Sequence, residues 1–290
     1  MKAVDLYARR RSPPQYAYEK RPSDAMLALY YLTELRYESF TPSHVRRAPA
    51  PASEPSSPEP TASERAKARL RARGRTRSLR GWSAVKLDFP EPVNLVLHAA
   101  LFCVLQVGFS QFNSAVIALQ VLLAIYVIWE SLQMMLRYRT SPPLFGPIYK
   151  ASSLSTFWGE TWHSVFASPC RSLAYGPLRY GLPSRGIPED FARGIGIIAS
   201  FALMGFFHVY ALAPILPIDA QARICAFFLV NGVGTVIEDA VWGKREHWVK
   251  ALLAWVFELA VASWTVEGLS VPPGLRNIQW SSLCDVKKGD

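Results

Sequence analysis

The sequence predicts an all-α fold: a polytopic transmembrane helical bundle of about five spans, with an interfacial helical loop and a disordered basic N-terminal arm. Three observations predict it. Half of the 290 residues are hydrophobic and only 19% are charged, against about 25% in a typical soluble protein. Residues 92–129 carry no charged side chain. Basic residues are concentrated before residue 90, where 18 Lys and Arg stand against 9 Asp and Glu, whereas residues 91–290 hold 14 against 13.

The first part, residues 1–90, is expected to be a mostly disordered, basic, cytosolic arm. Residues 41–63 are rich in Pro, Ala and Ser, and they lack the apolar periodicity that would let them bury enough surface to fold. Arg or Lys then occupies every second position from 65 to 77. No base-reading module accompanies this basic run, so we expect no specific nucleic-acid partner but contact with anionic membrane lipid.

The second part, residues 91–290, is expected to be embedded in a membrane. The 38 uncharged residues of 92–129 are too many for one helix across a hydrocarbon core of about 30 Å, and they suit two helices. Polar residues at 110–114 supply the turn between the two. The predicted spans lie near 93–109, 115–135, 194–218, 222–241 and 248–268, and the last is the weakest because it carries Glu258.

The loops between the spans predict the orientation of the chain. Basic residues gather in 137–193 and again in 243–250, whereas 214–221 contains no Lys or Arg. The positive-inside rule therefore places the basic arm and the 137–193 segment in the cytosol, in agreement with the two spans between them. We expect an integral membrane protein of the endoplasmic reticulum with a cytosolic N-terminal arm.

The segment 137–193 is rich in aromatic residues and proline, as is typical of chain at a membrane interface. Either Ser152 or Ser153 can cap a short helix over roughly 154–167. From the residues alone, an interfacial amphipathic helix whose His163 faces lipid headgroups is the favoured interpretation.

Three short elements of this segment resemble the wax-synthase-like branch of the membrane-bound O-acyltransferase family, a branch that includes fungal acetyltransferases acting on terpenoids. The elements are Pro143-Leu144-Phe145, Ser152-Ser153-Leu154 and Phe157-Trp158-Gly159-x-x-Trp162-His163. The last is also similar to the FYxDWWN motif of sterol and diacylglycerol acyltransferases. A second hallmark of the family is a histidine in a later apolar helix, matched here by His208, 45 residues after His163.

The resemblance implies an acyl-CoA-dependent O-acyltransferase, with residues 91–290 as an acyltransferase-like domain. Such an enzyme moves an acyl group, acetyl among the candidates, to the hydroxyl of a hydrophobic alcohol such as a terpenoid or a fatty alcohol. Acyl-CoA is then a co-substrate, and no bound cofactor or metal is implied. The expected setting is lipid metabolism or terpenoid biosynthesis within secondary metabolism. Family members carry additional spans before the motif, so either those helices are dispensable or this chain is N-terminally shortened.

His208 and His163 are the candidate catalytic residues. Esterification needs a base for the hydroxyl proton, and a buried neutral histidine suits that task. His208 lies deep in the apolar run 194–218, where an ionisable group is costly; the alternative is a structural histidine that joins two helices by a hydrogen bond. His163 could orient the thioester or donate to the oxyanion, or it could anchor the loop at the interface.

Substrate-binding roles are expected for the aromatic residues of the motif, Phe157, Trp158 and Trp162. A polar stripe on the fourth span adds candidates, because Asn231, Thr235 and Glu238 follow at the i, i+4, i+7 spacing of one helix face. This stripe could line the pocket for the acceptor alcohol or hold helices together. Gly232 and Gly234 beside it allow a neighbouring helix to approach closely.

A second interpretation is a non-catalytic membrane protein, lipid-binding or scaffolding, that descends from the same family. The two interpretations differ in whether His208 and His163 face one enclosed cavity. A small transporter has less support because no inverted repeat or matched pair of broken helices is visible. The four cysteines are scattered without a CxxC pair, which argues against a disulfide framework and a zinc site.

Overall fold

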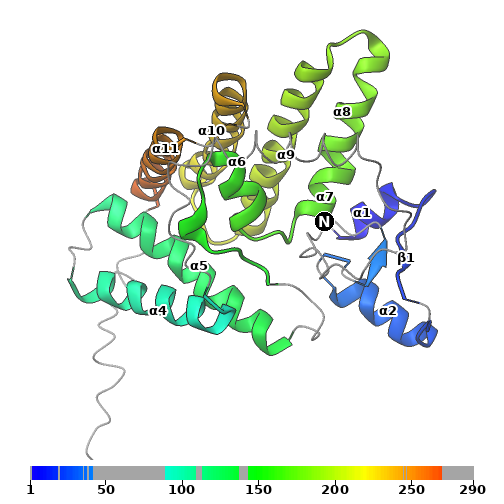
Figure 1. Cartoon of the computed structure of the whole chain (residues 1–290), viewed down its shortest axis with the longest axis horizontal. Coiled ribbons are helices and arrows are strands. Elements are labelled where there is room, and N and C mark those ends of the chain that lie inside the picture. The colour runs from blue at the N-terminus through cyan, green and yellow to red at the C-terminus, as the bar shows by residue number, and fades with distance from the viewer. Residues whose placement is uncertain are drawn as a thin grey trace, which may run out of the picture.

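The computed structural model describes residues 2–18, 20–34, 36–37, 39–41, 89–108, 113–136, 143–243, 245 and 247–269. Within them the regular secondary structure is helical apart from one two-stranded sheet (Figure 1). Four helices are long and apolar enough to cross a membrane: α5 (Ser114–Leu136), α9 (Glu189–Leu212), α10 (Ile218–Trp242) and α11 (Trp248–Glu267). A fifth apolar helix, α4 (Glu91–Gly108), is shorter. The predicted all-α membrane bundle is therefore confirmed.

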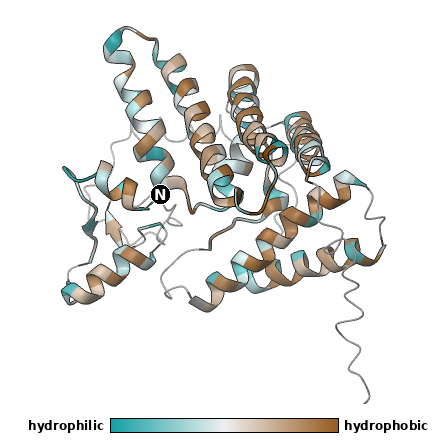
Figure 2. Cartoon of the chain, turned by 180° about the vertical axis from the view of Figure 1, so that it is seen from behind, coloured by the Kyte–Doolittle hydropathy of each residue, from teal (hydrophilic) through white to brown (hydrophobic). Residues whose placement is uncertain are grey.

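The five apolar helices form a row. Helix α4 packs on α5, α5 on α11, α11 on α10 and α10 on α9, so neighbours in space are not always neighbours in sequence (Figure 1). Large apolar side chains are exposed on the outward faces, for example Phe206 on α9 and Leu252 on α11, which are 69% and 54% exposed. Figure 2 shows hydrophobic residues along the length of these helices. In a soluble protein so much exposed apolar surface would drive association; in a bilayer it faces lipid.

Two glycines bring α10 close to both of its neighbours. A Cβ atom at Gly232 would lie 2.9 Å from the Cβ of Phe201 on α9, and one at Gly234 would lie 2.7 Å from Cζ of Phe257 on α11. Both distances are too short for a side chain to fit without a shift. The predicted close approach of helices at these glycines is confirmed.

The third span ends earlier than its uncharged run. The sequence predicts 194–218, but α9 ends at Leu212 and α10 begins at Ile218. Pro214 and Pro217 lie between them, and proline removes a backbone donor and disfavours helix in the residue before it. The two helices therefore meet through a tight connection within what looks in sequence like one apolar stretch.

The segment between α5 and α9 consists of short helical pieces: η1 (Ile148–Lys150), α6 (Leu154–Thr156), η2 (Phe157–Thr161), α7 (Ala167–Cys170), η3 (Arg171–Tyr175), α8 (Gly176–Gly181) and η4 (Pro183–Arg185). The pieces α7, η3 and α8 follow one another without a break and pack along α9 (Figure 1). By contrast, α6 packs against α10 and α11. The candidate site lies around α6 and η2.

The described N-terminal residues are folded, unlike the mostly disordered arm that the composition suggests. They form α1 (Lys2–Ala8), α2 (Asp24–Thr33) and the antiparallel strands β1 (Gln15–Tyr16) and β2 (Phe40–Thr41). Aromatic contacts hold this unit together, with the rings of Tyr31 and Phe40 centred 4.2 Å apart. Asp5 docks α1 onto α7 by accepting a hydrogen bond of 3.1 Å from Ser168 Oγ. Residues 42–88, with the Pro/Ala/Ser stretch and the basic run, lie outside the described residues.

Candidate active site

The motif Phe157–His163 begins in a short re-entrant helix rather than in the helix over 154–167 that the sequence predicts. Ser153 is the N-cap, as expected, and its Oγ accepts a hydrogen bond from Thr156 N at 2.9 Å. The helical turns end at Thr161, and Trp162 is extended, with φ −75° and ψ 163°. A tertiary contact explains the early end, because Gly146 N donates to the Thr161 carbonyl at 2.9 Å. The predicted extent of this helix is therefore wrong.

Glu238 holds the start of this re-entrant helix. Its Oε2 accepts a hydrogen bond of 2.8 Å from Leu154 N, and its Oε1 lies 3.3 Å from Ser155 N. These amides belong to the first turn of α6, where backbone donors lack partners within the helix. Lys250 Nζ on α11 lies 3.6 Å from Glu238 Oε1, and both side chains are less than 10% exposed. The carboxylate thereby joins the loop, α10 and α11.

Trp158 carries the loop deeper into the bundle. Its indole Nε1 donates to Asn231 Oδ1 at 3.1 Å, and Asn231 is fully buried. Asn231 precedes Glu238 by seven residues, or about 10 Å along the axis of α10. Irregular backbone at such depth is tolerated where protein surrounds it. The polar stripe of α10 thus faces inward as predicted, and its contacts hold the loop.

The other two aromatic residues of the motif lie in one cluster with Trp158. The rings of Phe157 and Trp162 are stacked with centroids 5.6 Å apart, and Phe157 also meets Trp158 edge to face at 5.2 Å. Trp158 in turn contacts Phe201 of α9 and Phe228 of α10, with centroids 5.3 and 6.1 Å away. Trp158 therefore links the cluster around Phe157 to the aromatic residues of α9 and α10.

His208 lies within that second group of aromatic residues. Its ring centroid is 4.5 Å from that of Phe228, and its Nδ1 lies 2.8 Å from the Met204 carbonyl oxygen. A carbonyl oxygen can only accept a hydrogen bond, so in the neutral ring Nδ1 carries the proton. The other ring nitrogen, Nε2, then has a lone pair with which it can accept a proton.

His163 is surrounded by aromatic rings. The centroids of Phe145, Trp162 and Phe166 lie 5.3 to 5.6 Å from its own. Its Nδ1 is buried and has no hydrogen-bond partner among the described residues. Burial, together with the nearby His208, lowers the pKa of His163 to about 4. At neutral pH the ring is therefore uncharged.

Phe166 brings the two histidines into one region. Its ring centroid lies 5.6 Å from that of His163 and 6.2 Å from that of His208. The loop and α9 thus place both predicted catalytic residues around one side chain. A hydrogen bond to the carbonyl four residues earlier does not by itself mark a catalytic histidine, because His98 on α4 makes the same contact with Asn94 O at 2.6 Å.

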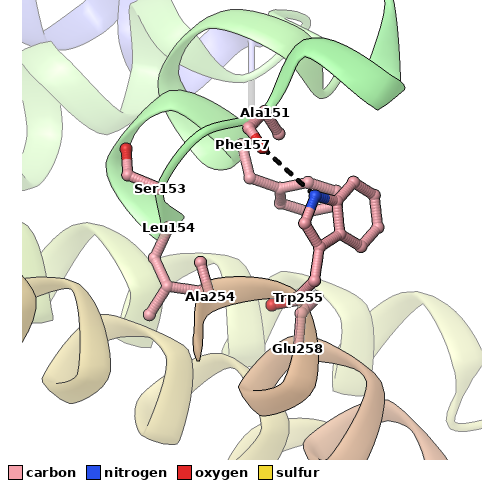
Figure 3. Close-up of a pocket in the computed structure, with 7 residues that line it drawn as sticks. All are labelled: Ala151, Ser153, Leu154, Phe157, Ala254, Trp255 and Glu258. Atoms are coloured by element: carbon pink, nitrogen blue, oxygen red, sulfur yellow. Dashed lines mark hydrogen bonds between the residues drawn. The ribbon is translucent and has the colours of Figure 1, made fainter. Parts of the chain in front are cut away.

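A small pocket lies beside these residues and is lined by neither histidine (Figure 3). Its walls come from the Ala151–Phe157 stretch and from α11, and its empty volume of about 180 Å³ includes space open to solvent. Glu258 on α11 belongs to this wall and is 5% exposed. The sequence shows Glu258 as a charged residue inside an apolar span. A charged residue inside an apolar span is a signal of a functional site. The sequence analysis took Glu258 only as an argument against the fifth span.

The described residues contain no group of three or more His, Cys, Asp or Glu side chains placed to hold a metal ion. Among the basic residues of the loop that could face the phosphates of coenzyme A, Arg179 is already paired, since it donates to the Glu189 carbonyl oxygen at 2.7 Å.

Comparison with known proteins points to one family. Residues 141–230 match the Membrane bound O-acyl transferase family. The protein named "Probable long-chain-alcohol O-fatty-acyltransferase 7" of Arabidopsis thaliana is 32% identical over 140 residues, which is 47% of this chain and 40% of that protein. The acetyltransferase spyB of Aspergillus fumigatus is 33% identical over 100 residues, or 34% of this chain and 17% of spyB. No solved structure matches.

The matches cover only part of each protein. A second Arabidopsis relative, named "Probable long-chain-alcohol O-fatty-acyltransferase 9", is 34% identical over 34% of this chain and 29% of its own length. The chain therefore spans less than half the length of these relatives. The matched segment runs from the residues before the motif through α9 to Val230 in α10, so it contains both His163 and His208. The predicted resemblance is confirmed by the match of residues 141–230 to the Membrane bound O-acyl transferase family.

Proposed function

We propose that the chain is an O-acyltransferase that moves an acyl group from acyl-CoA to the hydroxyl of a hydrophobic alcohol. One observation carries the proposal. Within the segment that matches the family, the re-entrant loop and α9 bring both His163 and His208 into contact with the ring of Phe166. His208 presents an unprotonated nitrogen there, as a general base requires.

The proposed reaction uses the two histidines in different roles. His208 Nε2 takes the proton of the alcohol hydroxyl while the oxygen attacks the carbonyl carbon of the thioester. His163 donates a hydrogen bond from the single N–H of its neutral ring to the oxyanion of the tetrahedral intermediate. The C–S bond then breaks, the ester forms, and the coenzyme A thiolate takes back the proton from His208. The aromatic residues Phe157, Trp158 and Trp162 form the apolar wall that keeps water away.

The names of the relatives support the choice of substrates. The plant relatives are named for fatty acyl groups and long-chain alcohols, and the fungal relative is named for acetyl. We therefore propose a fatty alcohol as acceptor, with a terpenoid alcohol of secondary metabolism as the acceptor if the acyl group is acetyl. We further propose that coenzyme A binds on the cytosolic side of the endoplasmic reticulum membrane, the side on which the positive-inside rule puts the basic loop.

The test compares two histidines that make the same local hydrogen bond. In membranes that contain the full chain, labelled acetyl-CoA and long-chain acyl-CoA are each offered with fatty and terpenoid alcohols. His208→Ala and His208→Asn should both lose about 10²- to 10⁴-fold in rate, because neither side chain can act as the base. His98→Asn is the matched control and should retain activity within a few-fold.

Two outcomes would contradict the proposal. An active His208→Asn variant would show that His208 is structural, because asparagine keeps a hydrogen bond but cannot take the proton. A parent protein that inserts in the membrane yet transfers no acyl group to any alcohol would favour the non-catalytic, lipid-binding interpretation.

A further inference from the structure

The folded N-terminal unit, the described residues from Lys2 to Thr41, docks on the loop that carries His163. Its helix α1 packs on α7 and η3 (Figure 1). A second contact joins Arg36 to Ser164, which lies 128 positions further along the chain. The proposed reaction gives this unit no role, although its contacts reach the residue next to His163.

Arg36 binds the chain on both sides of the His163 ring. Its guanidinium Nη1 donates to Ser164 Oγ at 3.0 Å and to the Pro143 carbonyl oxygen at 2.8 Å. Ser164 directly follows His163. Pro143 lies two residues before Phe145, whose ring meets the His163 ring edge to face. Arg36 is only 3% exposed, and arginine is rarely buried so far unless its donors are bonded. One buried guanidinium therefore joins the two stretches of chain that flank His163.

The unit also holds the chain on the far side of Phe166, the ring that both histidines contact. Asp5 is fully buried and accepts a hydrogen bond of 3.1 Å from Ser168 Oγ. Arg9, which pairs with Asp5 at 3.0 Å, donates to the same Ser168 Oγ at 2.8 Å. Phe166 thus lies between two serines, Ser164 and Ser168, that the N-terminal unit holds.

The orientation of the His163 ring depends on the chain around it. Its Nδ1 has no hydrogen-bond partner among the described residues, and its ring meets those of Phe145, Trp162 and Phe166. A donor to an oxyanion must lie within about 2.7–3.1 Å of it, and a misplacement of about 1 Å can cost about 100-fold in rate. The backbone that carries these rings must therefore be fixed, and Arg36 bonds to it.

The turn that presents Arg36 has an unusual backbone. Tyr37 has a φ of 54°, in the left-handed region that favours glycine. Its ring is 1% exposed and meets those of Tyr31 and Phe40 edge to face. Strained residues persist where their surroundings fix them, and they gather at functional sites. The strain at Tyr37 is thus what is expected beside a residue with a positioning role.

We infer that Arg36 is a positioning residue for acyl transfer: its bonds to Pro143 O and Ser164 Oγ hold the His163 N–H where it meets the oxyanion. The inference rests on the proposed function and adds the N-terminal unit to the groups that serve it. Arg36 acts through His163 and contacts no reacting atom. Both bonds come from one nitrogen, Nη1, so a lysine ammonium, which carries three donors, can replace them.

The first test separates kcat from KM in membranes that contain the full chain. Arg36→Met keeps an apolar side chain but has no donor, so kcat should fall about 10- to 100-fold while KM stays within a few-fold. Arg36→Lys should restore kcat to within a few-fold of the parent. Arg21→Met is the matched control, because Arg21 pairs with Asp24 on the exposed surface of the same unit, and it should keep the kcat of the parent.

A double variant shows whether Arg36 acts through His163. In a His163→Ala background, Arg36→Met should lower kcat no further, because the contact that it positions is already gone. A general structural role would lower kcat in both backgrounds. Ser164→Ala removes one of the two bonds from the loop side and should give a smaller fall, also absent in the His163→Ala background. If Arg36→Met loosens the N-terminal unit itself, seen as faster hydrogen exchange at 24–33, Ser164→Ala decides the test.

Hydrogen exchange in nanodiscs tests the contact without turnover. In Arg36→Met the amides of 162–168 should exchange about tenfold faster or more, because hydrogen bonds from a charged group are lost. Those of 154–161, which Glu238 holds, should keep the rates of the parent.

The two proposals fail in different ways. With an active parent, an unchanged kcat in Arg36→Met, an equal fall in Arg36→Lys, or a fall that persists in the His163→Ala background would overturn the role of Arg36 and leave the proposed function standing. A parent that transfers no acyl group would overturn the proposed function. Faster exchange at 162–168 would then still show that Arg36 holds the loop, and unchanged exchange would overturn that as well.

Discussion

Removal of the Glu238 carboxylate should release the re-entrant loop. Glu238→Ala leaves the amides of Leu154 and Ser155 without their acceptor and leaves Lys250 buried without its ion partner. Breaking a buried ion pair costs about 3–5 kcal/mol. Lys250 also donates to the Gly243 carbonyl oxygen at 3.0 Å, which offsets part of that cost. We therefore expect Glu238→Ala to weaken docking of the loop by about 3 kcal/mol. This corresponds to a roughly 100-fold larger population of the undocked loop.

Hydrogen exchange reads this population directly. Amides exchange in proportion to the fraction of time that they are open, so those of residues 154–161 should exchange roughly 100-fold faster in Glu238→Ala. The amides in the middle of α9 serve as the internal control and should not change. The double variant Glu238→Ala with Lys250→Met should recover part of the protection, because it removes the unpaired buried charge.

One result would refute this reasoning. Unchanged exchange at 154–161 in a correctly inserted Glu238→Ala protein would mean that the aromatic contacts of Phe157 and Trp158 hold the loop without the carboxylate. Faster exchange throughout the bundle would instead show that Glu238 supports the whole fold and not the loop in particular.

Two further predictions concern packing and pH. Gly232→Ala should lower the free energy of unfolding by about 1–3 kcal/mol, because the new Cβ meets the Cβ of Phe201, which cannot move without its helix. Gly234→Ala should cost less, because the ring tip of Phe257 that it meets can rotate. Equal shifts in melting temperature for the two variants would contradict this. The buried His163 has a pKa of about 4, below the ordinary value of about 6.5, so between these values the unfolded chain binds a proton that the folded chain does not. Stability should therefore fall as pH drops from about 6.5 to about 4, and melting curves of His163→Asn should lack this part of the loss; identical pH dependence in both proteins would count against it.

The long helices could be predicted because their signal is local. Each follows from a mostly apolar run of sufficient length, and the inward-facing stripe of α10 follows from the spacing of Asn231 and Glu238. The end of α9 was also within reach, since Pro214 and Pro217 mark it. The folded N-terminal unit had a signal too, in the tyrosines between residues 16 and 37, which the overall Pro and Arg content of the arm outweighed.

The re-entrant loop could not be predicted from its own residues. Its helix stops at Thr161 because Gly146 donates to the Thr161 carbonyl, and it starts where Glu238 meets it, 84 residues further along the chain. No periodicity within 154–167 contains that information. The role of Glu238 was open for the same reason: it is an acidic residue in an apolar helix, and only its neighbours show that it is engaged.

The contact between the loop and α10 has a consequence for the order of events during synthesis. Leu154 leaves the ribosome 84 residues before Glu238, and at about 5–20 residues per second this interval lasts roughly 4–17 s. During that time the loop has no α10 or α11 to pack against, and its amides are exposed at the membrane surface. Docking must therefore be a late step that follows insertion of the last two helices. A nascent chain arrested before α10 should present this aromatic loop to chaperones and proteases, whereas the released chain hides it.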